Sequence, residues 1–127
     1  MHTIARVLLG FAAILIAAGG LFDIFTPKLP INLAAACAGN ETAMKLVREL
    51  LRALGGALAA IGAAVLAIVL TSANSFRPRD LILILLLVVP AEGVNAICMR
   101  RVRSPWQIPA AFIALTLVGW VIAFASK

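Results

Sequence analysis

Few side chains in this 127-residue chain could carry chemistry, and those that could lie within or beside long apolar stretches. An ionisable group costs about 2.5–3.5 kcal/mol or more in hydrocarbon, so such groups are expected to face the inside of a fold and find polar partners. Carboxylates, guanidinium groups and amides brought together can join helices, hold the polar head of a bound molecule, or carry a proton. The candidate site residues are Asp23, Arg48, Arg52, Glu92 and Asn95.

The composition shows what surrounds these side chains. Hydrophobic residues make up 64% of the chain and charged residues only 13%, with a mean hydropathy of +1.11. Soluble domains are about half apolar and about a quarter charged. A chain of this size cannot cover so much apolar surface with itself. The sequence therefore predicts an integral membrane protein, because a bilayer solvates the outside of apolar helices.

The basic residues lie mainly between the apolar stretches and give the chain a net charge of +6. Such residues determine topology and contact anionic lipid headgroups. No basic run is interleaved with aromatic residues, so nucleic acid is not an expected partner, whereas membrane lipids are.

Four apolar stretches are long enough to cross a bilayer, which takes about 20 helical residues. The predicted fold class is all-α, an integral membrane bundle of four transmembrane helices in a single domain, residues 1–127. The spans are expected at about 4–25, 43–70, 79–99 and 106–125.

Prolines and polar residues mark the connections between these spans. Pro27 stops the first span, because proline biases the preceding residue away from helix. Residues 33–38 could form a short interfacial helix, and Asn40 is the expected N-cap of the second span, with Thr42 as its rival. Pro90 lies inside the third span and permits a kink there.

The connectivity brings the candidate site residues into one half of the bilayer. The end of the first span, the start of the second and the end of the third must lie on the same side. A rise of about 1.5 Å per residue places Arg52 and Glu92 at similar depths, about 9 Å from the surface. We predict a buried Arg52–Glu92 pair, with Asp23 paired to Arg48 or Arg52. Within the second span, Glu49 can also pair with Lys45 four residues before it or with Arg52 three residues after it. Structural joining of helices, a polar-ended pocket and a proton relay through Glu92 all remain open as roles.

Small residues follow two faces of the second span and allow close approach of helix backbones in lipid. This pattern predicts that the second span lies at the centre of the bundle and touches two neighbours. The first face carries Gly55, Ala59 and Gly62 or Ala63, and the second carries Gly56, Ala60 and Ala64.

Catalytic and metal-binding patterns are missing from the sequence. It has one histidine, His2, no tyrosine and no phosphate-binding glycine loop. Cys37 and Cys98 lack the CxxC spacing of a metal site. They are expected to be free thiols, although an oxidising compartment would allow a disulfide. We therefore expect no enzyme activity, no metal and no cofactor.

The second span also carries a family resemblance. The proline after the first span, the run Arg52-Ala53-Leu54-Gly55-Gly56 and Gly62 further on resemble the DoxX-like superfamily of small bacterial membrane proteins. The resemblance covers most of the chain and implies a four-helix bundle in the bacterial inner membrane with a binding or accessory role.

Two functions follow as expectations. The first is an accessory subunit or a binder of a lipophilic or amphipathic small molecule, with the polar cluster at one end of the bundle. The alternative is a small transporter or channel, coupled to protons or ions, that uses Glu92. A homodimer or a larger membrane complex stays open as the assembly.

Overall fold

The computed structural model describes residues 2–72, 76–101 and 103–126. Within these ranges the chain forms helices and no strand. Four helices are long and apolar enough to cross a membrane, so the chain is an all-α, multi-pass integral membrane protein. They are α1 (His2–Phe25), α3 (Glu41–Thr71), α4 (Pro78–Arg101) and α5 (Gln107–Ala125), and a short helix α2 (Ile31–Ala36) precedes α3.

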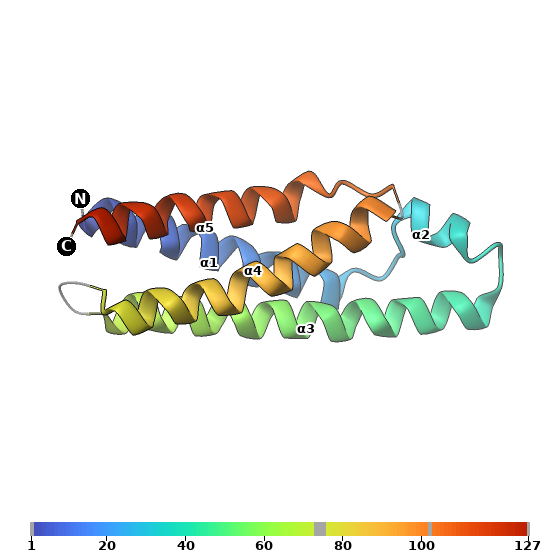
Figure 1. Ribbon diagram of the computed structural model, residues 1–127. Helices are drawn as coiled ribbons and strands as arrows, with labels where there is room; N and C mark the ends of the chain where they lie inside the picture. The colour runs from blue at the N-terminus through green and yellow to red at the C-terminus, as the bar shows by residue number, and fades with distance from the viewer. Residues whose placement is uncertain (1, 73–75, 102, 127) are drawn as a thin grey trace.

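The four long helices run up and down, so that α1 begins and α5 ends at the same end of the bundle (Figure 1). At the other end α3 extends beyond α1, and α2 lies over this extension (Figure 1). The bounds of the long helices differ from the predicted spans by two residues or fewer. The short helix also forms, two residues earlier than expected.

The closest packing in the bundle is between α1 and α3. Gly20 of α1 faces the backbone of α3, and Gly62 of α3 faces the backbone of α1, so that neither position has room for a side chain. Because helix association in lipid depends on van der Waals contact, this approach of backbones is a main source of stability. The first predicted face of small residues is thus used for packing.

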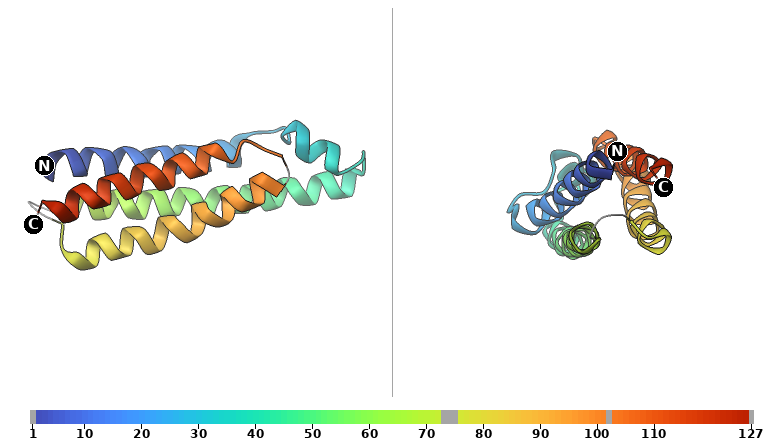
Figure 2. Two further views of the ribbon diagram at one scale, coloured as in Figure 1. Left: turned by 45° about the horizontal axis from the view of Figure 1, so that its top comes forward. Right: turned by 90° about the vertical axis from the view of Figure 1, so that its left-hand side faces the viewer.

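The second predicted face points outward. Ala60 and Ala64 are exposed, and a side chain placed on Gly56 would meet nothing. The second span touches two neighbours, α1 and α4, as predicted, but the prediction that it occupies the centre of the bundle is wrong. That place belongs to α1, which packs extensively on both α3 and α5, whereas α3 contacts α4 only sparsely. The end-on view shows α3 and α4 diverging from each other (Figure 2).

A core of aliphatic side chains fills the inside of the bundle, and lipid-facing apolar residues cover the outside. Leu9, Ile16, Val65, Ile84 and Val88 are among the fully buried side chains. The exposed set includes leucines on every long helix and phenylalanines on α1 and α5. In water such an apolar surface would cause aggregation, so the arrangement is stable only in an apolar solvent such as the bilayer interior.

The start of α3 confirms the predicted cap. The Asn40 side chain accepts a hydrogen bond from the Ala43 backbone N–H at 3.0 Å, and Thr42 makes no such contact. Replacing Asn40 by alanine should destabilise the first turn of α3 by about 1 kcal/mol. Amide hydrogen exchange at residues 43–46 would then speed up about fivefold. The matched control is Thr42→Ala, and an equal effect of both changes would contradict the cap assignment.

Candidate functional site

A cleft of about 380 Å³ lies where the end of α1, α2, the start of α3 and the end of α4 meet. Its walls are mainly apolar and include four leucines, and the side chains of Asp23 and Asn95 mark its polar end, with Ser104 as a third polar residue of the lining. Such a lining, mostly apolar with a few placed polar groups, is typical of sites for small molecules. The lining residues are Asp23, Pro30, Leu33, Val47, Leu50, Leu51, Leu54, Asn95, Cys98, Met99 and Ser104.

Asp23 reaches the cleft because Gly55 makes room for it. A β-carbon placed on Gly55 would lie 2.9 Å from the Asp23 β-carbon and 2.5 Å from the Gly20 carbonyl oxygen. Any larger residue at position 55 would therefore displace the last turns of α1. The close packing of α1 on α3 is thus also what positions this carboxylate.

Glu92 and Asn95 lie one helical turn apart on the inner face of α4. Glu92 is only 1% exposed and Asn95 is 8% exposed. The Asn95 Nδ2 group donates a hydrogen bond to Glu92 Oε2 at 3.4 Å. The Asp23 carboxylate is near enough to Glu92 to interact with it electrostatically. Two carboxyl groups and one amide from α1 and α4 therefore form the polar end, with Asn95 between Glu92 and the cleft.

Arg48 lies on the other side of Asp23. It lines a smaller pocket of about 50 Å³ together with Asp23, Thr26 and Lys28. The Arg48 Nε atom is buried and has no hydrogen-bond partner among the described residues. The structure thus brings Asp23 and Arg48 to one pocket, as expected, but records no ion pair between them in the described part of the chain.

The predicted Arg52–Glu92 pair is wrong. The Arg52 guanidinium pairs instead with Glu49 of its own helix, with 2.9 Å between Arg52 Nη1 and Glu49 Oε1. These two side chains are 43% and 56% exposed, whereas Glu92 is buried on another helix. Arg52 and Glu92 were expected at similar depths in the bilayer, but similar depth does not place two side chains face to face. Arg52 lies on the outward side of α3. Of the five candidate residues, Arg52 is therefore the one that stands apart from the polar end.

Sequence reasoning missed the contribution of α2 and of the turn between α4 and α5. Leu33 and Ser104 line the cleft, and Asn32 Nδ2 donates a hydrogen bond to the Arg103 carbonyl oxygen at 2.8 Å, which joins the two segments. Nothing in the local sequence marks these residues as neighbours, since 71 positions separate them. Cys98 also lines the cleft, and both cysteines are free.

Among the described residues, no group of three or more His, Cys, Asp or Glu side chains could hold a metal ion. In the described part of the chain, no hydrogen bond joins the Cys98 thiol or the Ser104 hydroxyl to a basic group. What the polar end offers is a set of hydrogen-bond acceptors at the edge of an apolar cleft.

Comparison with known proteins adds no relative. No family model, no curated protein and no solved structure matches this chain. The resemblance to the DoxX-like superfamily therefore stays a prediction.

Proposed function

We propose that this protein binds a lipophilic or amphipathic molecule in the cleft between α1, α3 and α4 and has no catalytic activity of its own. The observation that carries the proposal is the cleft of about 380 Å³ with mainly apolar walls and Asp23 and Asn95 at one end. This volume lies in the range of about 300–1,000 Å³ common to sites for small molecules. The apolar part of the ligand would pack on the leucines of α3.

The chemistry of the polar end favours a head group that donates hydrogen bonds. The Asn95 amide gives one of its two N–H hydrogens to Glu92, and its carbonyl oxygen can accept a further hydrogen bond. The Asp23 carboxylate is also an acceptor when it is ionised. A hydroxyl or an amine head would satisfy both oxygens, whereas a carboxylate or phosphate head would add a further acceptor.

We further propose that the protein resides in the bacterial inner membrane. It would act there alone, as a homodimer or as part of a larger membrane complex. The resemblance to small bacterial membrane proteins supports the location. A role as accessory subunit is compatible with ligand binding, because the cleft would then serve the larger complex.

The alternative is transport coupled to protons or ions through Glu92. This alternative is supported by the buried Glu92 carboxyl group, which accepts a hydrogen bond from Asn95, a residue that lines the cleft. Transport predicts flux driven by a pH gradient in proteoliposomes and its loss in Glu92→Gln. Binding alone predicts no flux in either protein.

Cys98 provides a direct test, because its thiol lies in the cleft wall and Cys37 does not line it. In a Cys37→Ser variant in nanodiscs, hexadecanol or hexadecylamine should slow the reaction of Cys98 with a lipophilic maleimide about tenfold. Palmitate, which has the same chain but an anionic head, should protect poorly.

Two controls make this test decisive. In Cys98→Ser, labelling of the remaining Cys37 should not respond to any of the three compounds. Asp23→Asn should weaken the protection of Cys98 by the amine. If neither hexadecanol nor hexadecylamine protects Cys98, ligand binding at this cleft is refuted.

A further inference from the structure

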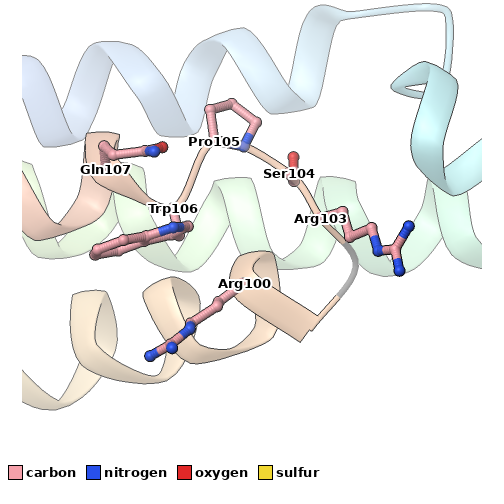
Figure 3. Close-up of a pocket in the computed structure, with 6 residues that line it drawn as sticks. All are labelled: Arg100, Arg103, Ser104, Pro105, Trp106 and Gln107. Carbon is pink, nitrogen blue, oxygen red and sulfur yellow. The ribbon is translucent and has the colours of Figure 1, made fainter.

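The turn between α4 and α5 carries a second, more open pocket of about 450 Å³, which differs in chemistry from the cleft and shares only Ser104 with its lining. We call it the turn pocket. Figure 3 shows the Arg100 side chain beneath the Trp106 ring and the Arg103 side chain extending from the opposite side of the turn. The residues that line it are Arg100, Arg103, Ser104, Pro105, Trp106 and Gln107.

The tryptophan indicates the depth of this pocket in the membrane. Trp106 directly precedes α5 and is 40% exposed. Tryptophans at the ends of spans lie at the level of the lipid headgroups. The Arg100 guanidinium carbon lies 5.8 Å from the centre of the Trp106 ring, within the range of a cation–π contact. This contact keeps a positive charge at headgroup depth.

The positive charge of the turn has no acidic counterpart. The chain has no Asp or Glu after Glu92. Among the described residues, none of Arg100, Arg101 and Arg103 forms an ion pair with an acid. The N-terminus of the 19-residue helix α5 opens at the same place and adds a partial positive charge. The net charge around this pocket is therefore positive, which favours an anion there.

Arg103 occupies a backbone position at which glycine is usual. Its φ is 55°, and its N–H bonds to the Arg100 carbonyl while the Ser104 N–H bonds to the Met99 carbonyl. This is the pairing of a Schellman motif, in which the left-handed residue is most often glycine. An arginine there accepts backbone strain that glycine would avoid. Arginine therefore occupies this position although the backbone conformation there favours glycine.

We propose that the turn pocket binds the phosphate of an anionic phospholipid from the adjacent leaflet. Arg100 and Arg103 supply the charge, Ser104 and Gln107 supply neutral hydrogen-bond donors, and Trp106 packs on the lipid below its headgroup. The proposal depends on the membrane placement of the chain and not on the ligand of the cleft.

The test compares phosphatidylglycerol with phosphatidylcholine in mixed nanodiscs that contain the full chain. Retained lipids are counted by native mass spectrometry after release. Each arginine near an anionic headgroup contributes about fivefold to affinity. We expect Arg103→Gly to reduce the preference for phosphatidylglycerol about fivefold, and Arg100→Gln with Arg103→Gly about 25-fold. Because glycine suits this backbone position, Arg103→Gly should melt in pure phosphatidylcholine at the wild-type temperature or above.

Arg101→Gln is the matched control, since it removes the same charge from the same turn but from a residue that does not line the pocket. It should reduce the lipid preference clearly less than Arg103→Gly does. If Arg101→Gln and Arg103→Gly reduce the preference for phosphatidylglycerol equally, the lipid is attracted by the overall charge of the turn and not bound in the pocket. That result would overturn the proposal. So would displacement of the lipid by millimolar inorganic phosphate, which would indicate a site for the free ion. Asp23→Asn, a change in the cleft, should not alter the preference.

Discussion

Replacing Gly62 by alanine should weaken the contact between α1 and α3 and lower the free energy of unfolding by about 2–3 kcal/mol. A β-carbon at this position would lie 2.6 Å from the Ala17 backbone nitrogen and 2.7 Å from the Ala13 carbonyl oxygen. Both atoms belong to the backbone of α1, so no side-chain rotation can relieve the overlap. The helices must move apart, which also loses the dispersion contacts that hold them together in lipid.

Gly56→Ala is the matched control for this prediction. A β-carbon at Gly56 meets nothing within 4 Å, although Gly56 lies on the same helix less than two turns away. Alanine is a better helix former than glycine by about 0.8–1 kcal/mol, so this change should be neutral or stabilising. Thermal unfolding of the purified protein in one detergent would measure both. Similar melting temperatures for the two variants would contradict the close approach of α1 and α3.

A second large effect is expected at the polar end of the cleft. Asn95→Leu should destabilise the protein by about 1–3 kcal/mol, because it removes the hydrogen-bond donor of a buried carboxyl group. Replacing both Glu92 and Asn95 by leucine should cost much less than Asn95→Leu alone, since no buried polar group is then left unsatisfied. The same unfolding measurement in detergent tests this, and additive losses in the double variant would argue against a Glu92–Asn95 contact.

Arg52 supplies the control for this pair of changes. Its ion pair with Glu49 is exposed, and exposed pairs contribute about 0–1 kcal/mol. Arg52→Ala should therefore change stability little, and its effect should add to that of Glu92→Leu. Strongly non-additive effects of Arg52→Ala and Glu92→Leu on stability would instead support the Arg52–Glu92 pair predicted from the sequence.

The sequence was a good guide to features that depend on local chemistry. The ends of the helices followed from proline, Asn40 and the length of apolar runs, all of which act within a few residues. The close packing of α3 likewise followed from Gly55 and Gly62. These features could be predicted because their physical causes are short-range.

The pairing of Arg52 with Glu92 was mispredicted although a usable signal was present, whereas the three-residue spacing of Glu49 and Arg52 did indicate the pair that forms. The buried residues of α3 recur at alternating spacings of three and four, and they are Gly55, Leu58, Gly62, Val65 and Val69. When this spacing is continued toward the N-terminus, the buried face includes Leu51 and Arg48 but not Arg52. Weighing this rotation together with depth would have placed Arg48 near Asp23 and Arg52 outside. The approach of α2 to the turn after α4 had no such signal, because it depends on the tilt of whole helices.

The length of α3 bears on how a ligand would reach the cleft. At about 1.5 Å per residue, its 31 residues extend about 46 Å, against about 30 Å for the hydrocarbon layer. Its charged residues, Glu41, Lys45, Arg48, Glu49 and Arg52, all lie in the first 12 positions. This base of α3 therefore stands among the headgroups, and the cleft beside it opens at the boundary between headgroups and acyl chains. An amphiphile resting in one leaflet already has its head and tail at these two depths, so it could enter sideways without carrying its polar head through the bilayer.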